Sequence, residues 1–66
     1  MQNVNIADAR EYVADHFNAR NIACEVQSAD YSAEYGMGAV DVLFTLDDGD
    51  YVMTVWYEGD KLYGEW

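Results

Sequence analysis

Apolar and polar residues alternate with two different periods along the chain, first helical and then two-residue. Residues 6–20 repeat apolar side chains at the three- and four-residue spacing of an amphipathic helix. Asn5 stands directly before this segment, where its side-chain oxygen can accept hydrogen bonds from the free N–H groups of the first turn. The predicted apolar stripe consists of Ile6, Ala9, Val13 and Phe17.

The opposite side of this predicted helix is acidic. It carries Asp8, Glu11, Asp15 and Asn18, and Asp8 also faces the positive end of the helix dipole. This pattern is compatible with an ordinary solvated helix face and also with a surface that contacts a partner.

After Asn21 the period becomes two, which predicts a first strand over residues 22–27. Its inward positions are Ile22, Cys24 and Val26. Residues 30–38 then read as a long loop that holds Tyr31, Glu34, Tyr35 and Met37 between small residues. Such a loop has a better claim to function than a plain connector, although part of it could instead cover the edge of the core.

The Asp48-Gly49 dipeptide predicts a β-hairpin between residues 39–46 and the strand that follows, since a type I′ turn requires positive φ at both central residues. The expected pairs are Leu46 with Tyr51, Phe44 with Met53, Val42 with Val55, and Val40 with Tyr57. A four-residue turn over residues 47–50 predicts the same pairs.

Gly59-Asp60 predicts a second hairpin with a type II′ turn. Its expected pairs are Glu58 with Lys61, Tyr57 with Leu62, and Met53 with Trp66. One helix and four strands in the order α-β-β-β-β predict an α+β fold in two layers, with the N-terminal helix packed on a four-stranded antiparallel sheet. Residues 1–66 form a single domain on this interpretation.

The same pairing predicts which residues face away from the helix. They are Asp41, Leu43, Thr45, Val52, Thr54, Trp56, Glu58, Tyr63 and Glu65. Trp56 and Tyr63 are expected opposite each other, with Asp41 on the other side of Trp56. An exposed aromatic pair can simply stabilise a sheet by about 0.2–1 kcal/mol. Trp and Tyr are also the residues that most often anchor protein interfaces.

The net negative charge of the chain limits which classes of molecule it can be expected to bind. The 66 residues include 13 acids and three bases, a formal charge of −10, where a magnitude of about 2–8 suffices for the solubility of a small domain. The chain is nevertheless 52% hydrophobic and has ten aromatic residues, which favours a folded domain over disorder. Direct binding to nucleic acid or anionic membranes is not expected, because it draws on clustered Lys and Arg. The expected partner is a basic protein or nucleoprotein complex.

Nine of the acids fall in residues 21–60, a stretch without Lys or Arg. Three of them, Asp47, Asp48 and Asp50, are expected to form a compact anionic knob at the first hairpin tip, where turn chemistry alone favours one or two Asp. The candidate partner-binding residues are Asp8, Glu11, Asp15, Glu34, Tyr35, Asp41, Asp47, Asp48, Asp50, Trp56, Glu58, Asp60 and Tyr63.

Catalytic and metal-binding patterns are nearly absent from the sequence. His16 and Cys24 are the only residues of their types and are expected to be helix and core residues, so we predict no enzyme activity and no cofactor. Residues 47–50 lack the ligand run and distant Glu of a calcium loop, so we predict no metal site. The single cysteine and the lack of a signal peptide or an 18-residue apolar run predict a cytoplasmic protein.

The small size, the strong acidity and acidic runs such as Asp47-Asp48-Gly49-Asp50 resemble those of phage-encoded inhibitors that imitate nucleic acid. This class includes anti-CRISPR proteins and inhibitors of restriction enzymes or of uracil-DNA glycosylase. The resemblance implies an inhibitor that binds the basic nucleic-acid site of a bacterial defence complex, most plausibly a CRISPR effector, and blocks DNA binding. The alternative is an acidic adaptor that uses the Trp56/Tyr63 face without DNA mimicry. A homodimer through that face is also conceivable.

Overall fold

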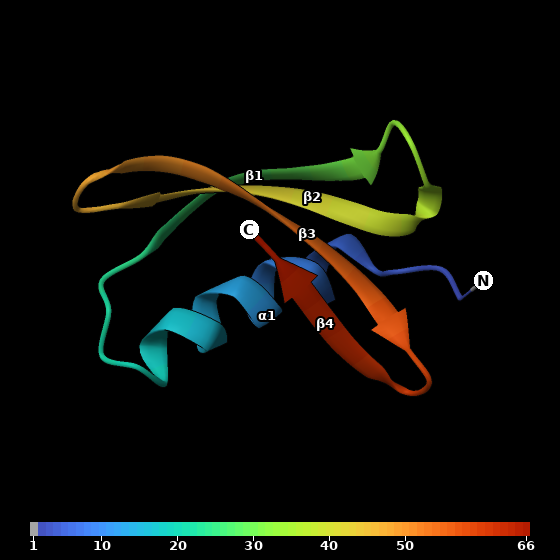
Figure 1. Ribbon diagram of the computed structural model, residues 1–66, viewed down its shortest axis with the longest axis horizontal. Helices are drawn as coiled ribbons and strands as arrows, with labels where there is room; N and C mark the ends of the chain where they lie inside the picture. The colour runs from blue at the N-terminus through green and yellow to red at the C-terminus, as the bar shows by residue number, and fades with distance from the viewer. Residues whose placement is uncertain (1) are drawn as a thin grey trace.

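The computed structural model describes residues 2–66 and contains one helix and one antiparallel sheet with strand order β1-β2-β3-β4 (Figure 1). Helix α1 lies across one face of the sheet, so the predicted two-layer α+β fold is confirmed. The elements are α1 (Ile6–Asn18), β1 (Glu25–Ser32), β2 (Gly36–Leu46), β3 (Gly49–Glu58) and β4 (Lys61–Glu65).

Both ends of α1 are closed by local hydrogen bonds. The Asn5 side chain accepts a hydrogen bond from the Asp8 backbone N–H at 3.1 Å, which confirms the predicted N-cap. The helix ends at Asn18, two residues earlier than expected. Asn21 then adopts positive φ of 58°, and the Ile22 N–H donates to the Phe17 carbonyl at 3.0 Å, as in a Schellman motif.

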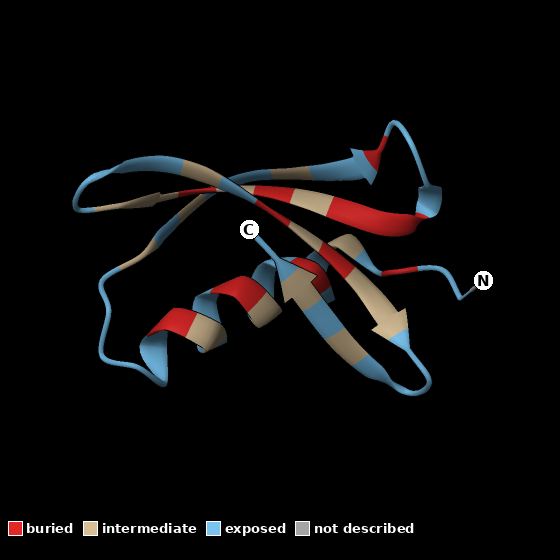
Figure 2. Ribbon diagram, viewed as in Figure 1, coloured by how far each residue is buried: buried red, intermediate tan, exposed pale blue. Residues whose placement is uncertain are grey.

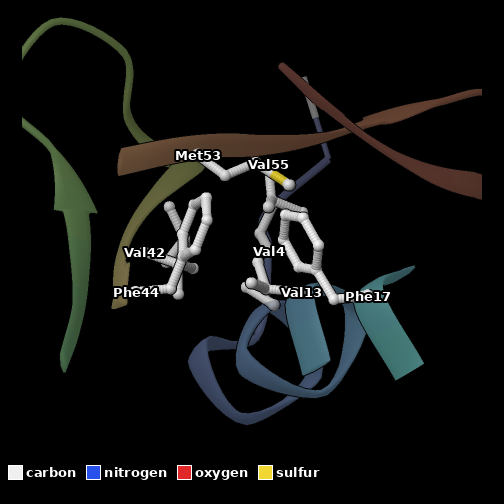
Figure 3. Close-up of a cluster of buried hydrophobic side chains, with 9 residues drawn as sticks. Val4, Val13, Phe17, Val42, Phe44, Met53 and Val55 are labelled. Carbon is white, nitrogen blue, oxygen red and sulfur yellow. The ribbon is translucent and has the colours of Figure 1, made fainter. Parts of the chain in front are cut away.

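The core lies between α1 and the inner faces of β2 and β3 (Figures 2 and 3). The predicted stripe is confirmed, with Ile6 half-buried and its other three members fully buried. Val4 is also buried, and its N–H donates to the Met37 carbonyl at 2.9 Å, a contact that the pattern did not predict. The fully buried side chains are Val4, Ala9, Val13, Phe17, Val40, Val42, Phe44, Met53 and Val55.

The predicted first strand is present, and Cys24 and Val26 pack against the core as expected, but its bounds and the loop predicted after it were wrong. The strand starts at Glu25, Ile22 is 43% exposed, and Asp30 belongs to β1 rather than to a loop. A β-bulge between Val26 and Ser28 inserts Gln27, so the inward positions change phase along the strand. The link to β2 shrinks to a turn over residues 33–35. The bulge broke the period-two pattern and made the second half of the strand read as a loop.

The β2–β3 pairing also differs from the prediction, by two residues. Leu46 pairs with Gly49 instead of Tyr51, so the turn consists of Asp47 and Asp48. Neither Asp has positive φ, while Gly49 has φ 144°. This matches a type I turn, which favours Gly directly after its two central residues. A two-residue shift keeps every side chain on its original face, so the predicted inner and outer faces stand.

The β3–β4 hairpin follows the prediction. Glu58 pairs with Lys61, Tyr57 with Leu62, and Gly59 has φ 65°, as a type II′ turn requires. The pairing ends at Thr54 with Glu65, one step before the expected pair of Met53 and Trp66.

Trp66 follows β4 and closes one end of the core without being buried, since it is 55% exposed. Its ring packs edge-on against Phe17, Phe44 and Tyr51, at centroid distances of 5.2, 5.5 and 5.3 Å respectively. Within residues 2–66, no helix has the length and apolar character needed to cross a bilayer.

Gly64 of β4 packs tightly against side chains of α1 and β3. A Cβ atom at this position would lie 2.5 Å from Met53 Sδ and 2.8 Å from Tyr12 Cε1. We therefore expect Gly64→Ala to lower the free energy of unfolding by about 1–3 kcal/mol, because the core would be overpacked. Urea denaturation measures this change. The neighbouring exposed change Glu65→Ala should stay within about 0.5 kcal/mol, and equal stabilities for the two variants would contradict the close packing.

Candidate functional site

We call the sheet face turned away from α1 the outer face. Its side chains form rows that run across the strands. One row crosses all four strands, because Asp30 pairs with Asp41, Asp41 with Thr54, and Thr54 with Glu65. We call these four residues the acidic row. The sequence-based candidates did not include Asp30, which was assigned to a loop, or Glu65, which was predicted on this face but not chosen as a partner-binding residue.

Asp30 and Asp41 stand directly opposite each other on adjacent strands. Like charges in this arrangement destabilise a sheet. Asp41 is partly buried, and its Oδ1 accepts a hydrogen bond from Thr54 Oγ1 at 2.8 Å, which fixes this carboxylate in place. The acidic row therefore opposes folding to some extent.

A second acidic row crosses the first three strands at the end of the sheet near the β2–β3 turn. It contains Glu25, Thr45 and Asp50, where Thr45 pairs with both acids. Gln27 Nε2 donates to Glu25 Oε1 at 2.8 Å and to Thr45 Oγ1 at 3.2 Å, and Thr45 Oγ1 donates to Asp50 Oδ1 at 2.6 Å. Since Asp41 and Thr45 are four residues apart on β2, the two rows lie about 13 Å apart.

An aromatic row runs beside the acidic row. Trp56 pairs with Tyr63, as predicted, and Tyr63 is 44% exposed. The residue on the other side of Trp56 is Ala39 rather than Asp41, because of the two-residue shift in the β2–β3 pairing. Asp41 is instead two pairs further along the strands, beside Thr54.

A groove of about 620 Å³ opens where the aromatic row meets the turn between β1 and β2. Ala39 forms part of its lining and is almost completely buried. The groove brings together three of the predicted site residues, Glu34, Tyr35 and Trp56. Other residues that line it include Thr54, Tyr57, Glu65 and Trp66.

Ser32 holds the turn that forms one wall of this groove. It is a buried polar residue, and its Oγ accepts hydrogen bonds from the backbone N–H groups of Glu34 and Tyr35 at 3.1 and 3.0 Å. The backbone reverses through Gly36 with φ 60°. A serine hydroxyl that accepts hydrogen bonds from the backbone N–H groups two and three residues later is a known turn motif. Ser32 could therefore have indicated this turn in the sequence, but the segment was assigned to a long loop.

The remaining candidate residues do not join the groove. Asp8, Glu11 and Asp15 are exposed on α1, which belongs to the other layer of the fold. The β2–β3 turn, with Asp47 and Asp48, and the β3–β4 turn, with Glu58 and Asp60 beside it, lie at opposite ends of the molecule in Figure 1. The candidate acids thus form several surfaces, of which the outer face combines acids with aromatic rings.

The acids of the β2–β3 turn interact with neighbouring side chains. The Asp48 carboxylate, as a hydrogen-bond acceptor for the Tyr51 hydroxyl, raises the pKa of Tyr51, and burial and the Asp48 charge raise it further. Asp50 accepts a hydrogen bond from Thr45 as part of the second acidic row. This bond orders the position of Asp50.

Burial shifts the pKa values of His16 and Cys24. Burial lowers the pKa of His16, and the nearby Arg20 charge lowers it further. Burial raises the pKa of Cys24, which disfavours the reactive thiolate. In the part of the chain that the structure describes, no three His, Cys, Asp or Glu side chains gather in a way that could hold a metal ion.

The chain matches no protein-family model, no curated protein and no solved structure.

The repulsion within the acidic row leads to a testable expectation. Asp30→Asn should raise the free energy of unfolding by up to about 1 kcal/mol, because it removes one of two opposed charges. Urea denaturation at low salt measures this gain, and added salt should reduce it. Glu11→Gln removes the same charge from the helix and serves as the control. If both variants gain equally at every salt concentration, the cross-strand repulsion is not the cause.

Proposed function

We propose that this protein is a small acidic binding protein that occupies the basic nucleic-acid site of a partner and blocks it stoichiometrically. The observation that carries the proposal is the acidic row, in which Asp30 and Asp41 face each other across neighbouring strands. Two opposed carboxylates lower the stability of the fold, which is readily explained if they contribute to binding. A basic partner surface would neutralise both charges and so gain binding free energy from them.

The geometry of the outer face suits such a partner. Nucleic-acid sites present Lys and Arg side chains that normally contact phosphates. Two rows of carboxylates about 13 Å apart on a hydrogen-bonded sheet offer fixed charges in place of phosphates. The net charge of −10 would speed association with a basic surface and make it sensitive to salt.

Inhibition of a bacterial defence complex, with a CRISPR effector as the first case to test, is the specific form of this proposal. It takes support from the resemblance in size, charge and acidic runs to phage-encoded inhibitors, and it places the protein in the cytoplasm where such complexes act. The proposal assigns no enzymatic role.

The test is affinity capture of the tagged protein from a bacterial lysate that contains an active CRISPR effector, at low and moderate salt. We expect a basic nucleic-acid-binding complex to be recovered and duplex DNA to displace it. The double variant Glu25→Lys/Asp30→Lys should weaken binding at least about 100-fold, because like charges would then meet across the interface. Recovery of a partner that ignores DNA would contradict the proposal.

A matched control separates the outer face from overall charge. Glu11→Lys/Asp15→Lys makes the same charge change on the exposed side of α1. It should weaken binding much less than Glu25→Lys/Asp30→Lys if the outer face is the contact surface. Equal losses for the two double variants would assign binding to net charge alone.

An adaptor that binds without imitating nucleic acid is the second candidate, and the pairing of Trp56 with the exposed Tyr63 favours it. Aromatic residues of this kind anchor ordinary protein interfaces. Trp56→Ala/Tyr63→Ala would then abolish capture, whereas Glu25→Lys/Asp30→Lys would be tolerated and DNA would not compete.

A further inference from the structure

The groove beside the β1–β2 turn has a chemistry that differs from the rest of the acidic surface. Building on the proposed function, we infer that this groove binds an arginine side chain of the basic partner. The inference names the group that anchors the partner on the outer face, and it rests on the lining, the charge and the fixed wall of the groove.

Aromatic rings form much of the lining. Tyr35 comes from the β1–β2 turn and Trp56 from the outer side of β3. Tyr57 and Trp66 contribute from the side of the sheet that packs against the core. Trp56 is also flanked by Tyr63 across the last hairpin. A guanidinium group is planar and weakly hydrated, so it stacks well on the faces of Trp and Tyr, and Trp is the strongest partner of this kind.

Carboxylates complete the lining, and none of its residues within 2–66 is basic. Glu34 comes from the turn and Glu65 from β4, so the two acids reach the groove from different elements. Asp41 lies behind Thr54, to which it is hydrogen-bonded. Carboxylates can accept paired hydrogen bonds from the fork of N–H donors on arginine, which an ammonium group lacks.

The wall of the groove is fixed before any partner binds. Ser32 accepts hydrogen bonds from the backbone of both Glu34 and Tyr35, and the Gly38 N–H donates to the Tyr35 carbonyl at 3.3 Å. A preorganised turn loses less entropy on binding than a free loop would.

The negative charge of the outer face also disfavours two other binding partners, a second copy of this chain and an anionic ligand. A second copy of this chain would bring another −10 and oppose acids to acids on the outer face. A phosphate or carboxylate ligand would meet Glu34 and Glu65 without a compensating cation in the lining. An arginine side chain can pack its apolar stem against the aromatic rings and place its positive charge beside the carboxylates.

The test compares hexa-arginine and hexa-lysine peptides, which have the same length and charge. Both tryptophans of the chain, Trp56 and Trp66, line the groove, so the tryptophan emission of the unaltered protein reports on it. We expect the arginine peptide to bind at least about tenfold more tightly than the lysine peptide and to change the tryptophan emission. Equal affinities, or binding that leaves the tryptophan emission unchanged, would overturn the inference.

Variants of the groove locate the preference. Glu34→Gln/Glu65→Gln and, separately, Trp56→Leu should bring arginine-peptide binding down to the level of the lysine peptide. The control Glu11→Gln/Asp15→Asn removes two charges from α1 and should weaken both peptides equally, so that the arginine preference survives. If the groove variants keep the preference, the arginine site lies elsewhere and the inference is wrong.

Ser32→Ala tests the positioning of the turn without changing the exposed lining. It should reduce the arginine preference and leave lysine-peptide binding unchanged, and Ser32→Thr should restore the preference because it keeps the hydroxyl. Circular dichroism of each variant checks that the fold is intact. An unchanged preference in a folded Ser32→Ala variant would show that the turn does not position the site.

The two proposals fail separately. Loss of the arginine preference together with capture of a complex that duplex DNA displaces would reject the groove site and keep the proposed function. An arginine preference that depends on Glu34 and Glu65, without any partner that DNA displaces, would keep the site and reject nucleic-acid mimicry.

Discussion

The fold depends on the burial of one helix stripe against one face of one sheet. Val13 and Phe17 of α1 pack with Phe44 and Met53 of the inner sheet face, and the chain has only one cysteine, so no internal disulfide adds to this core. A domain of 66 residues can build only one such layer of packing. Because the single helix covers a single face, the outer face of the sheet has no second layer over it.

That uncovered face explains where charge and aromatic rings come together. Acids on the outer face would give the open sheet protection against face-to-face packing with another copy, since like charges across an interface repel each other. The arrangement goes further than protection requires, since Asp30 and Asp41 face each other at a cost to stability. Two other carboxylates, Glu34 and Glu65, line the groove together with Trp56, next to the turn held by Ser32.

The two-residue difference in the β2–β3 pairing shows how local turn chemistry shapes this surface. Both possible turns keep the apolar residues inside, so the core has the same faces in either case. The observed turn at Asp47 and Asp48 places Ala39 next to Trp56 and Thr54 next to Asp41. Ala39, a small residue beside the Trp56 indole, forms part of the groove lining. The Thr54 hydroxyl donates a hydrogen bond to the Asp41 carboxylate and fixes its position. The groove therefore depends on the pairing, whereas the core does not.

The sequence by itself determined the helix, its Asn5 cap, the Gly59-Asp60 turn and the inner and outer faces, because each depends on residues close together in the chain. Tertiary structure decided the bulge at Gln27 and the β2–β3 pairing, and with them the acidic row and the groove. A bulge inverts the alternation of a strand, and a two-residue shift leaves the alternation unchanged. The periodicity of one strand therefore gives a wrong prediction at a bulge and does not reveal a two-residue shift in pairing. Both features are fixed by hydrogen bonds to a neighbouring strand.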